Sequence, residues 1–135
     1  MKKFLSPLIA IFTLLSLCLP SYAALPDDYS PQWLNISTIV STLGFSGTHG
    51  GATGSVDGKP GTSKVEATLT VYKQVGGSWE YVDSDSDSTT TDDYIALSVG
   101  FNGVSNTNYK SVFEVSVTRN GTTETTSKTC YDTCP

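Results

Sequence analysis

Apolar and polar residues alternate along most of this chain from residue 34 onward. The clearest run is Lys64 to Val75, in which every second residue from Val65 to Val71 is apolar and the residues between them are polar. A period of two places the two sets of side chains on opposite faces of a β-strand. The pattern recurs over Tyr94 to Phe101 and Tyr109 to Arg119, and no stretch keeps helical spacing for more than two turns. The chain is therefore predicted to be all-β.

Four weaker segments complete the predicted set of strands: residues 34–45, 52–57, 79–82 and 122–129. In the first segment, the apolar residues change from even to odd positions near Ile39 and Val40, which indicates a bulge or a break. Asn120-Gly121 is the kind of two-residue hairpin turn that needs positive φ. The Thr-rich last strand has no large apolar side chain and is therefore expected at a sheet edge. About seven strands at this spacing predict a single antiparallel β-sandwich with Greek-key connections.

The hairpin at Gly76-Gly77 can be built in two registers. A two-residue loop places Tyr72 opposite Tyr81 and Gln74 opposite Trp79, on the solvated face. A three-residue loop turns Trp79 toward the core, because a shift of one residue moves every side chain to the other face. A buried Trp suits a sandwich, so we expect Trp79 in the core; the exposed alternative makes Tyr72, Trp79 and Tyr81 a candidate aromatic binding face.

The first 23 residues have the pattern of a secretory signal peptide: a basic start, an apolar run and small residues before the end at Ala23. We expect a helical signal peptide over residues 1–23, an N-terminal arm over 24–33 and the sandwich over 34–135. The mature protein is then secreted and extracellular, with no membrane attachment after cleavage. Loss of Lys2 and Lys3 reduces the 8 basic residues to 6 against 13 acidic ones, a formal charge of −7. This charge disfavours nucleic acid as a partner.

Alternate aspartates, Asp83, Asp85 and Asp87, followed by Asp92, form the main acidic stretch. Alternate carboxylates can converge on calcium, so these four residues are a candidate calcium site. The similarity to a helix-loop-helix calcium loop is partial, since Ser88 and Tyr94 stand where Gly and Glu are needed. The alternative is a solvated loop between two strands, and we expect no other cofactor.

Cys130 and Cys134 remain after signal cleavage, and an even number of cysteines in an oxidising compartment predicts a disulfide between them. His49 is the single histidine of the chain, so the sequence offers only one candidate base for a catalytic triad. The chain is therefore expected to be non-enzymatic; the alternative is a small extracellular carbohydrate-active enzyme or esterase.

The stretch from Lys64 to Ser127 resembles small secreted proteins of Gram-positive bacteria that have no assigned activity. The resemblance lies in the run from Val65 to Lys73, in Trp79, and in the run from Val115 to Gly121. Tyr109 ahead of alternating apolar residues is similar to the tyrosine-bearing strand of immunoglobulin and fibronectin-type sandwiches. The resemblance implies a fold and a compartment and no catalytic residue.

These observations predict a secreted β-sandwich that acts as a binding or surface-interaction module. A glycan would stack on the aromatic residues. A surface protein would instead add a strand at the Thr-rich edge.

Overall fold

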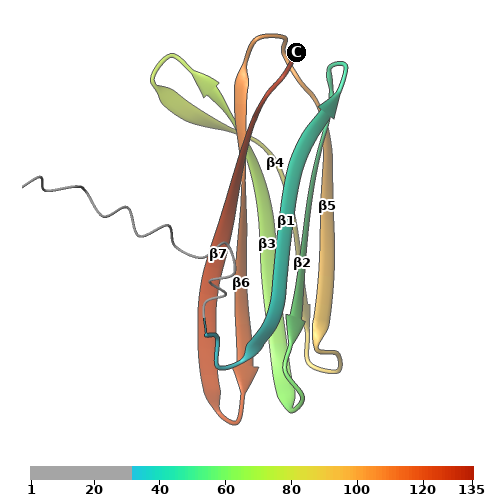
Figure 1. Cartoon of the computed structure of the whole chain (residues 1–135), viewed down its shortest axis with the longest axis vertical. Helices are drawn as coiled ribbons and strands as arrows, with labels where there is room; N and C mark the ends of the chain where they lie inside the picture. Colours follow the sequence, from blue (N-terminus) through green and yellow to red (C-terminus); the bar gives the residue numbers. More distant parts are fainter. Residues whose placement is uncertain (1–31) are drawn as a thin grey trace, which may run out of the picture. The chain divides into compact units, whose positions relative to one another are not determined.

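The computed structural model describes residues 32–135, which form two antiparallel β-sheets packed face to face (Figure 1). Within these residues there are seven strands: β1 (Ile36–Ser46), β2 (His49–Gly58), β3 (Thr62–Val75), β4 (Ser78–Thr89), β5 (Tyr94–Asn102), β6 (Asn108–Arg119) and β7 (Thr122–Thr133). The predicted all-β, seven-stranded sandwich is confirmed. The predicted signal peptide and most of the predicted arm lie outside the described residues. In residues 32–135 no helix has the length and apolar character needed to span a membrane.

The two sheets have three and four strands, in the orders β1-β2-β5 and β4-β3-β6-β7. In constant-type immunoglobulin domains the fourth strand pairs with the fifth. Here β4 pairs with β3 instead, because the Gly76-Gly77 turn keeps it in the same hairpin. This arrangement makes β4 and β7 the edges of the larger sheet, as expected for the Thr-rich last strand.

The core lies between the sheets and is built from the residues that the alternation assigns to one face. Its buried side chains include Val65, Leu69 and Val71 of β3, Ile95, Leu97 and Val99 of β5, and Phe113, Val115 and Val117 of β6. Full burial of one such side chain stabilises a fold by about 1.5–3 kcal/mol, so this layer dominates the stability. Gly54 of β2 packs against the Phe113 ring, and a Cβ atom there would lie only 2.5 Å from the ring.

Tyr109, the second residue of β6, links the β5–β6 connection to the core. Its side chain is buried, and its hydroxyl oxygen accepts a hydrogen bond of 2.9 Å from the backbone N–H of Val104, five residues upstream. A tyrosine near the start of the sixth strand with this bond is a hallmark of immunoglobulin-like sandwiches. At the next turn, Asn120 and Gly121 have φ of 52° and 76°, as the hairpin prediction required.

The parity change in β1 falls earlier than predicted. The register between β1 and β2 shifts between Ile36 and Thr38, so both Ile36 and Ile39 reach the core. Val40, which lies at the predicted parity change, is exposed. The segment before β1 also differs from the prediction, because Trp33, assigned to the arm, packs against the core.

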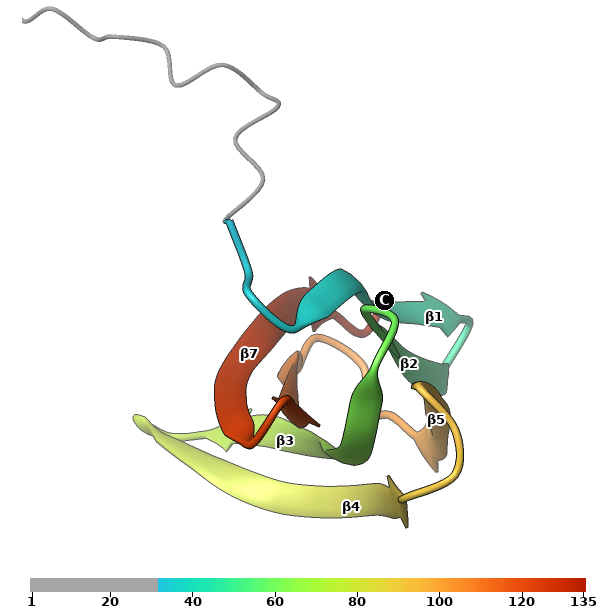
Figure 2. The ribbon, with the colours of Figure 1, turned by 90° about the horizontal axis from the view of Figure 1, so that it is seen from below.

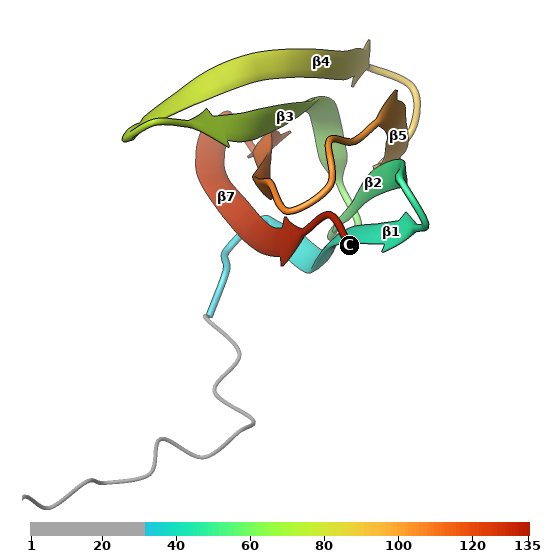
Figure 3. The ribbon, with the colours of Figure 1, turned by 90° about the horizontal axis from the view of Figure 1, so that it is seen from above.

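The two sheets approach each other at both sides. Seen along the strands, β1 lies beside β7 and β5 lies near β4 (Figures 2 and 3). At the β1–β7 side the Cys130 thiol donates a hydrogen bond of 3.3 Å to the carbonyl oxygen of Ser41. Near the start of β1, the Glu124 carboxylate accepts hydrogen bonds from the backbone N–H groups of Leu34, Asn35 and Ile36. The chain is thus held against β7 before it enters the first strand.

Candidate ligand-binding face

The β3–β4 hairpin has a two-residue loop, and this places Trp79 outside the core. Val75 pairs with Ser78, Gln74 with Trp79, and Tyr72 with Tyr81. The expectation of a core Trp is therefore wrong, and the alternative register is correct. The physical reason is that Gly76 adopts the positive φ of 61° that a tight two-residue turn needs, which sets the parity of the whole hairpin.

Trp79 meets a tyrosine from the opposite edge of the sheet, Tyr131 of β7. Three strand-to-strand steps separate β4 from β7, a distance of about 14 Å in a flat sheet. The two ring centroids are nevertheless only 6.1 Å apart. A bulge at Val82 bends β4 here, because Tyr72 pairs with Tyr81 while Val71 pairs with Asp83. In the two end-on views the tip of the hairpin extends to the β7 side of the sheet (Figures 2 and 3).

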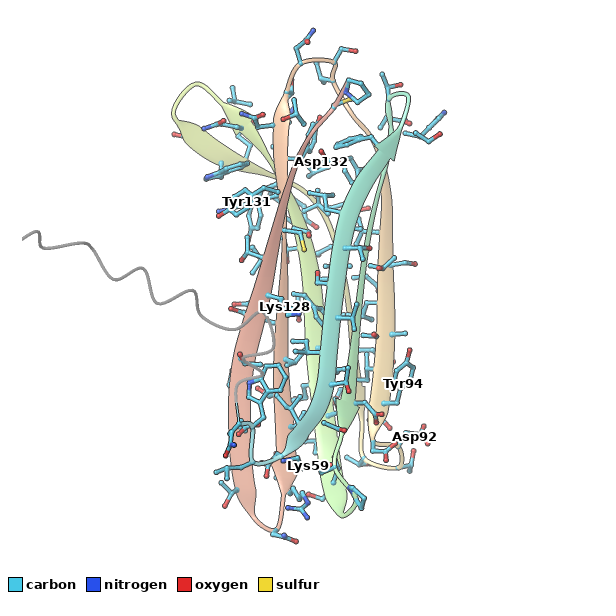
Figure 4. The ribbon with its side chains drawn as sticks, in the orientation of Figure 1. Lys59, Asp92, Tyr94, Lys128, Tyr131 and Asp132 are labelled. Carbon is cyan, nitrogen blue, oxygen red and sulfur yellow. The ribbon has the colours of Figure 1, made fainter. Side chains whose placement is uncertain are left out.

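The outer face of the four-stranded sheet therefore carries an aromatic cluster, which we call the aromatic face: Tyr72, Trp79, Tyr81 and Tyr131. Tyr81 and Tyr131 are 60% and 69% exposed, so their rings are open to a partner. Figure 4 shows Tyr131 projecting from β7 on the side of the hairpin. Sequence reasoning missed Tyr131, because the last predicted strand ended at residue 129. Continuing the alternation of β7 would have found it, since Tyr131 shares the parity of Thr125 and Thr129.

Lys110 lies at the centre of the aromatic face. It pairs with Tyr72 on one side and Tyr131 on the other. Its Nζ atom is 4.7 Å from the centroid of the Trp79 ring and 5.3 Å from that of Tyr72. Each such contact is worth about 0.5–1 kcal/mol at an exposed site. Lys110 therefore packs against two of the rings and favours their present orientations.

A hollow of about 400 Å³ lies beside Trp79 and Tyr131, and Tyr109 and four polar residues line the rest of it. The polar side chains are joined in a chain of hydrogen bonds. Thr133 Oγ1 donates to Asn108 Oδ1 at 2.7 Å, and Asn108 Nδ2 donates to Gln74 Oε1 at 3.0 Å. Asp132 completes the lining. Two aromatic rings with a few oriented polar groups form the usual composition of a small-molecule site.

A second, larger hollow of about 760 Å³ continues along the same face of the sheet. Hydroxyl and carboxylate side chains line it: Thr68, Ser86, Ser88, Ser116, Glu66 and Glu114. Glu66 is paired with Lys64 at 2.9 Å, and both side chains are exposed. The outer face thus offers an aromatic hollow at one end and a hydroxyl-rich surface below it.

The candidate calcium ligands are not brought together. Asp83, Asp85 and Asp87 belong to β4 rather than to a loop, so Asp83 and Asp87 are about 13 Å apart along the strand. Calcium binds oxygens at only about 2.3–2.6 Å, so these carboxylates cannot all reach one ion. Asp92 lies in the β4–β5 connection, at the end of the sandwich away from Tyr131 (Figure 4). Across residues 32–135 no group of three or more acidic, His or Cys side chains is arranged to hold a metal ion.

The structure does not contain the predicted disulfide, since Cys130 and Cys134 both carry free thiols. Four residues of extended chain span about 13 Å, whereas bridged Cα atoms lie about 4.4–6.8 Å apart. Cys134 is also held in place, because its N–H donates to Thr107 at 3.0 Å and its carbonyl accepts from Asn106 at 2.8 Å. A bridge would require the end of β7 to leave the sheet.

No protein-family model matches this sequence, and no curated protein matches it either. Among solved structures, the chain is similar to Spo0M, a sporulation control protein from Bacillus subtilis. The match has a TM-score of 0.36 and 13% sequence identity, and it covers 71% of this chain and 47% of that one. This chain spans about half the length of Spo0M.

Proposed function

We propose that this chain is a secreted, non-enzymatic module that binds glycans through the outer face of its four-stranded sheet. Secretion rests on the signal-peptide pattern of residues 1–23. Binding rests on the aromatic face and the hollow beside it. The observation that carries the proposal is the contact between the Trp79 and Tyr131 rings, whose centroids are 6.1 Å apart, beside a set of polar side chains.

This combination suits the chemistry of a sugar ring. The faces of a pyranose are lined with C–H groups that pack against aromatic rings, while its hydroxyls point outward around the rim. Trp79 and Tyr131 supply the rings, and Gln74, Asn108 and Thr133 supply hydrogen-bonding groups close by. The larger hollow extends the surface with hydroxyls and carboxylates that could bind further sugar units.

An enzymatic role has less support from the same surface. Glu66 and Glu114 line the larger hollow, and paired carboxylates are the usual machinery of glycoside hydrolysis. Both side chains are exposed, so they lack the desolvated surroundings that tune a catalytic acid. Strand addition at β7 also has less support, because β1 lies against this edge.

Binding of the secreted form, residues 24–135, to a panel of polysaccharides tests the proposal. In affinity electrophoresis, a polysaccharide that is bound should retard the wild-type protein. Trp79→Ala and Tyr131→Ala should each lower the affinity about tenfold or more, since aromatic residues dominate such sites. Tyr94→Ala is the matched control, because Tyr94 is a half-exposed tyrosine on the outer face of the other sheet. Absence of binding to every polysaccharide, or equal loss in the Tyr94 variant, would contradict the proposal.

A further inference from the structure

The hydrogen-bond chain in the aromatic hollow has a direction, and this direction restricts the ligand. Thr133 donates to the carbonyl oxygen of Asn108, and the Asn108 amide nitrogen donates to the carbonyl oxygen of Gln74. Each of the two carbonyl oxygens therefore accepts one hydrogen bond within the chain. The Gln74 amide nitrogen stands at its end, and within residues 32–135 no protein group accepts a hydrogen bond from it.

Because Gln74 lines the hollow, its amide nitrogen offers two N–H donors to a ligand there. The complementary group is a hydrogen-bond acceptor that does not also need to donate, such as a carbonyl oxygen. A carboxylate is also such an acceptor, but Asp132 lines the same hollow and the secreted chain carries a formal charge of −7. Charge complementarity therefore favours an uncharged acceptor.

We infer that the hollow recognises a 2-acetamido sugar, whose carbonyl oxygen accepts from Gln74 Nε2 while its pyranose ring packs against Trp79 and Tyr131. This inference rests on the proposed function and narrows it to glycans built from N-acetylated amino sugars. The acetamido methyl group adds apolar surface that the rings can cover. Gln74 is then the residue that determines specificity, and the aromatic pair supplies affinity.

Two uncharged linear hexasaccharides test this inference by isothermal titration: β-1,4-linked N-acetylglucosamine and β-1,4-linked glucose. Wild type should bind the acetylated hexamer about tenfold more tightly than the glucose hexamer, which is the effect of one hydrogen bond. Gln74→Glu keeps the size of the side chain but replaces the donor nitrogen with an acceptor oxygen, so it should reduce this preference to about threefold or less. Asn102→Asp, on an exposed residue of β5, makes the same change in charge on the other sheet.

The outcomes separate the inference from the proposed function. Equal binding of the two hexamers, or an unchanged preference in Gln74→Glu, would overturn the inference and leave the glycan-binding proposal standing. Tighter binding of a proline-rich peptide than of any sugar would overturn both, because aromatic grooves also bind such peptides. Pull-down on chitin and on peptidoglycan distinguishes the two sources of acetamido sugars; retention on neither would count against the inference.

Discussion

At the scale of single residues, Glu124 makes the contacts with the longest reach along the chain. Its carboxylate accepts hydrogen bonds of 2.7, 3.2 and 3.2 Å from Leu34, Asn35 and Ile36, about ninety residues away. Asn35 reinforces the contact by donating to the carbonyl oxygens of Val117 and Thr122. Desolvation raises the pKa of Glu124, but the three backbone hydrogen bonds and nearby Lys59 outweigh it, so the pKa lies below its ordinary value.

Glu124→Gln should therefore destabilise the fold in a pH-dependent way. A carboxyl group whose pKa is lowered by folding stabilises the protein above its unfolded pKa of about 4.3, and this contribution is lost as the pH falls through the folded pKa. We expect a loss of about 1–2 kcal/mol at pH 7 that shrinks toward pH 3. Urea unfolding at several pH values measures this, with Glu80→Gln as an exposed control. A loss of the same size at pH 3 and pH 7 would contradict the assignment.

At the scale of elements, β4 shows why an acidic run can be a strand. The register places Asp85 opposite Leu69 and Asp87 opposite Ala67, on the face of the sheet that carries the core. These aspartates stay exposed because β4 is the edge strand of the wider sheet. Inward-pointing charges on an edge strand discourage pairing with a second chain, which gives the acidic stretch a structural role.

Asp85→Val should therefore promote self-association through β4. Valine favours strands and removes the charge that a second edge strand would have to bury. Sedimentation velocity over a range of concentrations should show dimers or larger species that wild type lacks at the same concentration. Asp92→Val, in the β4–β5 connection, is the matched control and should behave as wild type. Equal sedimentation of the Asp85 and Asp92 variants would exclude this role.

At the scale of the whole molecule, the C-terminal segment helps to hold the two sheets together. Cys134, the penultimate residue, is fully buried, and its Sγ atom lies against Gly103, where a Cβ atom would come within 2.8 Å of it. Cys130 contacts β1 through Ser41. Closure of the sandwich thus depends on the C-terminal segment being in place, and this arrangement leaves the two thiols apart.

Cys134 should react with a thiol reagent only when the whole domain unfolds. For a domain of ordinary stability, we expect alkylation of the native protein to be at least about a thousandfold slower than that of the unfolded chain. Mass spectrometry of the denatured protein should show two alkylated cysteines without prior reduction. A mass 2 Da lower, with no label on either cysteine, would show that the disulfide forms and that the end of β7 leaves the sheet.

The sequence by itself determined the strands, the Asn120-Gly121 turn and most core positions, because alternation and turn chemistry act between neighbours in the chain. Only the tertiary structure decided the rest. The register of the β3–β4 hairpin and the bulge at Val82 placed Trp79 beside Tyr131, and the path of the chain brought Glu124 to residues 34–36. Such contacts join residues about 50 to 90 positions apart, and no local pattern specifies which distant side chain will meet which.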